Sequence, residues 1–121
     1  MATLIRVVNG FYAALFVIAA LVSLGFLVAA LDGLGRGPEA VWLSCAWAAL
    51  FALFAALCFA NMRRARGTQP VWLVAANLAA LLLAGAGLFA ADPVIVWMAG
   101  VSILPFAVTL LAHALAGRKS A

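Results

Sequence analysis

The chain has 121 residues, of which 70% are hydrophobic and 8% charged, and its net charge is +4. A soluble domain is about half apolar and about a quarter charged, so this composition excludes an ordinary soluble fold. Every Asp, Glu, Lys and Arg lies outside four apolar stretches at residues 7–31, 40–62, 70–91 and 93–117. A helix needs about 20 apolar residues to cross a bilayer. The sequence therefore predicts an all-α, four-transmembrane-helix antiparallel bundle, a single integral membrane domain over residues 1–121.

The first predicted span, residues 7–31, is too long for the apolar core of a signal peptide, so we expect an uncleaved helix. Asp32-Gly33 closes it, and the glycine-rich stretch up to Pro38 forms an outer loop. Pro38-Glu39 opens the second span, because proline suits the first turn of a helix and glutamate suits its positive end.

The second predicted span, residues 40–62, has two contrasting faces. Small residues at four-residue spacing would let another helix approach closely. Bulky residues on the opposite face either pack within the chain, face lipid, or bind a partner. The small residues are Ala48, Ala52 and Ala56, and the bulky ones Trp47, Phe51 and Phe54.

Gly67 is expected to end the second span in the left-handed conformation. The third span, residues 70–91, carries another small-residue stripe at Ala76, Ala80 and Ala84. Asp92-Pro93 predicts a tight turn and a helix cap before the fourth span. Within that span Pro105 predicts a kink, because proline removes a backbone hydrogen bond. Matches at a 55-residue offset, such as Val41-Trp42 with Val96-Trp97, suggest two tandem helical hairpins.

Basic residues gather on one side of the predicted bundle. Six of the seven fall there, whereas Arg36 falls on the other side with the acidic residues. Because cytoplasmic loops are rich in Lys and Arg, we expect both termini to be cytoplasmic. The bias toward Arg, Ala, Leu and Gly suggests a GC-rich bacterium and hence the inner membrane. The six residues, which set topology and meet anionic lipid, are Arg6, Arg63, Arg64, Arg66, Arg118 and Lys119.

Five polar side chains within the spans map to the half nearer the basic side. They form a candidate polar layer: Asn9, Asn61, Asn77, Thr109 and His113. One interpretation is hydrogen bonding between helices together with solvation at the interface. The other is a small polar pocket open to the cytoplasm or the inner leaflet.

The residues of a catalytic centre are missing from the sequence pattern. His113 is the only histidine, whereas haem would need a second axial ligand and zinc three or four ligands. Cys45 and Cys58 lie about 20 Å apart on one predicted helix, too far to bridge each other. No acid/base pair or phosphate-binding loop can be assembled. We therefore expect neither an enzyme nor a cofactor, and no nucleic acid, because no basic stripe with interleaved aromatics exists.

Three functions remain open. The first is an accessory or structural subunit of a larger or homo-oligomeric membrane complex, whose partners are the bilayer and other membrane subunits or copies of itself. The second is a small homo-oligomeric transporter or channel for a neutral or lipid-like solute. The third is a membrane-resident immunity or regulatory protein. Length and span number resemble small multidrug exporters and fluoride channels, but residues 7–31 lack the glutamate of the exporters, and the fluoride-channel motifs do not occur.

Overall fold

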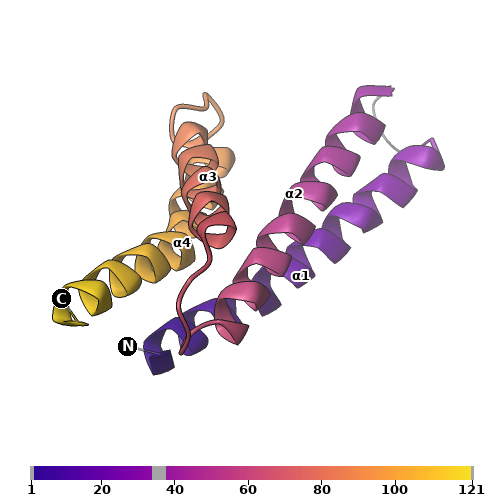
Figure 1. Cartoon of the computed structure of the whole chain (residues 1–121). Helices are drawn as coiled ribbons and strands as arrows, with labels where there is room; N and C mark the ends of the chain where they lie inside the picture. The colour runs from indigo at the N-terminus through magenta and orange to yellow at the C-terminus, as the bar shows by residue number, and fades with distance from the viewer. Residues whose placement is uncertain (1, 34–37, 121) are drawn as a thin grey trace. The chain divides into compact units, whose positions relative to one another are not determined.

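The computed structural model describes residues 2–33 and 38–120, the side chains of 117–120 excepted. The described chain is all-helical, as predicted. Its elements are α1 (Ala2–Leu31), α2 (Pro38–Arg63), α3 (Val71–Gly87) and α4 (Pro93–Ser120) (Figure 1). The helices α1, α2 and α4 are long and apolar enough to cross a bilayer, whereas α3 has 17 residues. By the length and composition of these helices, the chain is an integral membrane protein.

The chain forms two compact units, and their boundary cuts across the first two helices. The network unit consists of Met1–Gly10 and Leu57–Ala121, so it contains α3, α4, the first turns of α1 and the last turns of α2. The hairpin unit consists of Phe11–Ala56, which is the remainder of α1 and α2.

The predicted third span, residues 70–91, is wrong at its end, because α3 stops at Gly87. Gly85 and Gly87 favour the coil, since glycine costs about 1 kcal/mol relative to alanine inside a helix. The backbone then tightens into turns, in which the amide of Leu88 donates to the carbonyl of Gly85 at 3.1 Å and that of Phe89 to Ala86 at 3.1 Å. Hydropathy alone does not distinguish this apolar turn from helix.

Two glycines, Gly33 and Gly67, were predicted to end α1 and α2, and the structure agrees with the prediction only at Gly33. Gly33 has φ +81° and ends α1 as expected. Gly67 is not left-handed, so that prediction is wrong; its amide donates to the carbonyl of Arg64 at 3.3 Å in a turn of negative φ. Residues 34–37 of the predicted outer loop, including Arg36, lie outside the described residues.

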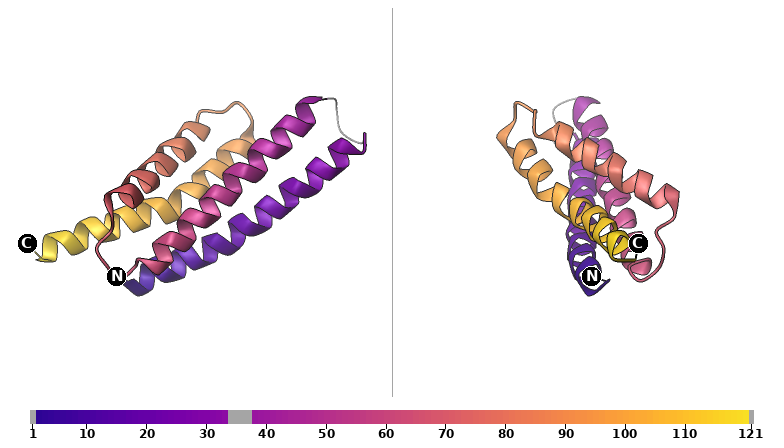
Figure 2. Two further views of the ribbon diagram at one scale, coloured as in Figure 1. Left: turned by 45° about the vertical axis from the view of Figure 1, so that its right-hand side comes forward. Right: turned by 60° about the vertical axis from the view of Figure 1, so that its left-hand side comes forward.

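Helices α3 and α4 pack closely as a hairpin in the network unit (Figure 2). Asp92 caps α4 as predicted, because its carboxylate Oδ1 accepts a hydrogen bond from the amide of Val94 at 2.9 Å. The close approach needs a glycine, since a Cβ built on Gly87 would lie 2.7 Å from the Cβ of Ala99. Helix α4 continues through Pro105 without interruption, and a kink there stays a prediction.

Candidate functional site

Four residues of the predicted polar layer meet in the interior of the network unit. Asn9, Asn61, Asn77 and Thr109 have no exposed surface, and each comes from a different helix. Burial of a polar side chain in apolar surroundings is unfavourable unless its hydrogen-bonding groups are paired. The hydrogen bonds of these four side chains therefore decide whether the layer can bind a ligand or only joins helices.

A continuous chain of hydrogen bonds joins the four side chains. Asn9 Nδ2 donates to Thr109 Oγ1 at 2.8 Å, and Asn61 Nδ2 donates to Asn9 Oδ1 at 3.2 Å. Asn61 and Asn77 form a reciprocal amide pair, with Nδ2 to Oδ1 distances of 2.7 and 2.8 Å. This set of four residues is called the amide network below.

Three members of the amide network are also anchored to their own helices. Asn9, Asn77 and Thr109 each donate to the carbonyl four residues earlier, at 2.8, 2.9 and 2.7 Å. Asn61 has no such bond and donates both of its amide protons to other helices. It is therefore the residue on which the connection between α1, α2 and α3 depends.

Every donor proton of the amide network has an acceptor. Three asparagine amides supply six N–H protons and Thr109 supplies one hydroxyl proton, which together match the seven bonds. The amides leave no proton for a ligand. The network therefore acts as a connection between helices and has no spare donor with which to recognise a solute.

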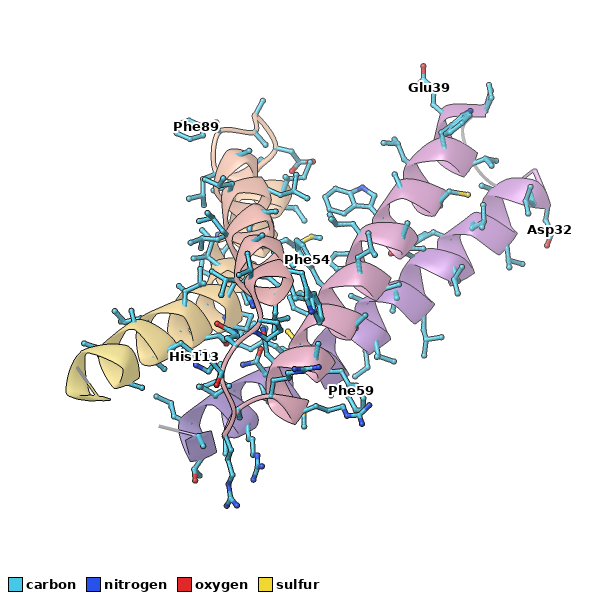
Figure 3. The ribbon with its side chains drawn as sticks, viewed as in Figure 1. Asp32, Glu39, Phe54, Phe59, Phe89 and His113 are labelled. Carbon is cyan, nitrogen blue, oxygen red and sulfur yellow. The ribbon has the colours of Figure 1, made fainter. Side chains whose placement is uncertain are left out.

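His113, the fifth predicted member, lies apart from the amide network. It lies beside the loop that joins α2 and α3 (Figure 3). There it borders a cavity of about 670 Å³. Its Nε2 is buried and has no hydrogen-bond partner among the described residues, and the same is true of both amide atoms of Gln69. Arg66 and Thr68 also line this cavity.

No family model, curated protein or solved structure matches this chain.

The aromatic face of α2 packs against α1 within the hairpin unit. The ring centroid of Phe16 lies 6.2 Å from that of Phe51 and 5.3 Å from that of Phe54, and Trp47 stacks on Phe51 at 5.7 Å. Both Phe51 and Phe54 are buried. These two rings take part in packing within the chain, whereas a partner-binding role for this face stays a prediction.

The two small-residue stripes lie in different surroundings. On α3, Ala80 and Ala84 are buried and Ala76 is partly buried. On α2, Ala48 is buried, but Ala52 and Ala56 are exposed. The exposed pair is available to a neighbouring helix, which could approach closely there.

The basic residues that were expected to set topology are at the surface where they are described. Arg6, Arg63, Arg64 and Arg66 are exposed and belong to the network unit. The side chains of Arg118 and Lys119 lie outside the described part of the chain.

Sequence reasoning missed Gln69 as a site residue. Thr68 and Gln69 directly precede the predicted third span, and the sequence pattern assigns them no role in a site. The available signal was a pair of polar residues between Gly67 and Pro70. Polar side chains in such a short loop are not paired by packing between helices, so they can take part in a site. The cavity itself depends on how the loop passes α4, which the local sequence does not encode.

Proposed function

We propose that this chain is a non-catalytic accessory or structural subunit of a membrane complex, formed with a larger partner or with copies of itself. The observation that carries the proposal is the saturation of the amide network. The residues of the amide network are the span residues best suited to bind a polar solute. All of their N–H and O–H protons are already donated to acceptors within the same chain. Their role is to hold helices together, as interhelical hydrogen bonds do in membrane proteins.

The exposed small residues of α2 support an assembly role. Ala52 and Ala56 lie four residues apart, beside the 68% exposed side chain of Leu53. Small residues at this spacing let two helix backbones approach, and the gain is van der Waals contact that lipid does not match. We therefore expect a neighbouring subunit to contact the hairpin unit at Ala52 and Ala56.

The test is purification of the tagged chain from its native membranes in a mild detergent. A larger protein, or a defined homo-oligomer, should be recovered with it. The double change Ala52→Leu with Ala56→Leu should reduce that recovery, whereas the matched change Ala75→Leu with Ala79→Leu, at exposed positions of α3, should not. Monomer alone in the wild-type preparation would contradict the proposal.

A small homo-oligomeric transporter or channel for a lipid-like solute is the second candidate. It is favoured by the cavity beside His113, because that cavity joins apolar helix surface to polar groups. Recovery of homo-oligomers alone, together with solute flux in liposomes, would support this candidate over the subunit.

The proposed orientation places both termini in the cytoplasm of a bacterium, with the chain in its inner membrane. It is supported by three exposed arginines at the end of α2 and directly after it, Arg63, Arg64 and Arg66. The acidic residues lie elsewhere: Asp32 directly follows the last residue of α1, and Glu39 lies in the first turn of α2 (Figure 3). In a background without Cys45 and Cys58, an impermeant maleimide should label Ala91→Cys in intact cells, but Arg64→Cys only after permeabilisation. The reverse pattern would contradict this orientation.

A further inference from the structure

The cavity beside His113 is bordered by two kinds of surface. Its polar side is the loop after α2, with Arg66, Thr68 and Gln69, together with His113 of α4. Its apolar side includes Val74 of α3 and Leu110 of α4. The volume of about 670 Å³ falls within the range of about 300–1,000 Å³ that is usual for ligand sites.

The polar side of the cavity contains hydrogen-bonding groups without partners. The Nε2 and Oε1 atoms of Gln69 and the Nε2 atom of His113 are buried and unpaired within the described part of the chain. An unpaired buried polar group is destabilising, and native structures contain few of them. In the same unit the amide network pairs every donor, so the unpaired groups at the cavity are an exception within this fold.

The charge at the cavity is positive. Arg66 lines it, and no acidic residue occurs among the described residues that line it. The acidic residue of the network unit is Asp92, which precedes α4 and caps its first turn, whereas His113 lies near the other end of that helix. An anion is therefore favoured over a cation at this position.

The wall of the cavity is held by packing. Ala65, which directly precedes Arg66, is buried in one apolar cluster with Ile5 of α1 and Ala112 of α4. Ala112 is the neighbour of His113 in the chain. The loop and helix that carry the polar groups are thus joined by a packed contact.

We propose that this cavity binds the phosphate headgroup of an anionic phospholipid from the surrounding bilayer. The guanidinium of Arg66 and the hydroxyl of Thr68, both exposed, would donate to phosphate oxygens, and the Nε2 of Gln69 would join them once its side chain turns into the cavity. An acyl chain would lie along Val74 and Leu110. Basic pockets between transmembrane helices bind anionic headgroups in this way. A phosphate compound in solution would share the headgroup contacts but would leave the apolar side unfilled. The inference does not rest on the proposed subunit role.

Native mass spectrometry of the full-length protein in a neutral detergent tests the proposal. The probes are phosphatidylglycerol, phosphatidylcholine and inorganic phosphate. The protein should retain phosphatidylglycerol in preference to phosphatidylcholine. The combined change Arg66→Gln and Gln69→Leu should weaken that retention about tenfold or more, because charge-assisted hydrogen bonds are lost. Arg64→Gln, which removes a neighbouring charge that does not line the cavity, should leave it nearly unchanged.

A second variant separates loss of binding from loss of folding. Gln69→Glu keeps the shape of the side chain and places a carboxylate beside the phosphate position, so it should abolish phosphatidylglycerol retention while the Tm without lipid stays measurable. Equal retention of the two lipids, or equal retention by all variants, would overturn the proposal. Binding of inorganic phosphate that displaces phosphatidylglycerol would overturn the lipid as occupant in favour of a soluble phosphate compound.

Discussion

Asn61 and Asn77 hold each other through two hydrogen bonds, from Nδ2 to Oδ1 in each direction, at 2.7 and 2.8 Å. The pair joins the last turn of α2 to the second turn of α3 across the loop between them. A reciprocal amide pair has one arrangement of donors and acceptors, so it fixes both the separation and the relative height of the two helices.

Replacement of Asn61 by leucine should lower the free energy of unfolding by about 2–4 kcal/mol, because three interhelical bonds are lost and partner groups stay buried. Asn77→Leu should cost less, and the double change should cost less than the sum, because the two residues share two bonds. Denaturation in a mild detergent measures all three variants. Ser23→Ala is the control, since that hydroxyl bonds only to Ala19 of its own helix in the described structure. Additive losses would contradict the pair.

Gly87→Ala should destabilise the α3–α4 hairpin by about 1–3 kcal/mol, because the added Cβ would lie 2.7 Å from the Cβ of Ala99. Gly85→Ala is the matched control. Among the described residues, no atom beyond its own stretch of helix backbone lies within 4 Å of its added Cβ, so the same exchange should stabilise α3 by up to about 1 kcal/mol. Thermal unfolding of the two variants should give shifts of opposite sign, and shifts of the same sign would contradict the close approach.

Asp92→Ala should weaken the start of α4 by about 0.5–2 kcal/mol, because the amide of Val94 loses its side-chain acceptor at 2.9 Å. Asp92→Asn keeps an acceptor oxygen and should retain most of the stability. Amide hydrogen exchange at Val94 would report the change locally. Equal protection in the alanine and asparagine variants would show that the cap contributes nothing.

Gln69→Leu should raise the Tm of the delipidated protein, because it removes a buried amide whose two polar atoms have no partner. Asn77→Leu is the same kind of exchange at a paired amide and should lower the Tm. Addition of phosphatidylglycerol should then stabilise the wild-type protein more than the Gln69→Leu variant. A loss of stability in Gln69→Leu without lipid, equal to that of Asn77→Leu, would mean that the Gln69 amide is paired.

Charge-free apolar runs were sufficient to predict four helices and their order in the chain. The end of α3 was not predictable in the same way, because Leu88 and Phe89 are as apolar as the helix before them. What ends the helix is the local cost of Gly85 and Gly87 and the close contact of Gly87 with Ala99. The second of these depends on tertiary structure and is not visible in a hydropathy pattern.

The polar residues divide in a similar manner. Their depth in the spans predicted that Asn9, Asn61, Asn77 and Thr109 share one layer, and the structure brings these four together. Their bonding directions depend on helix rotation, which the sequence does not reveal. His113 lies at a similar level but faces the cavity with Gln69, because the loop after α2 passes beside α4 there.

The hydrogen bonds of the amide network must form in a particular order while the chain is being synthesised. Asn61 and Asn77 are 16 residues apart and can pair once α3 has followed α2 into the membrane. The bond from Asn9 to Thr109 joins residues 100 positions apart, so it must wait for the last helix to be synthesised. Until then one amide proton of Asn9 lacks its native acceptor. A nascent chain that stops before α4 is therefore chemically distinct from a finished one, by a single unpaired donor inside the bilayer.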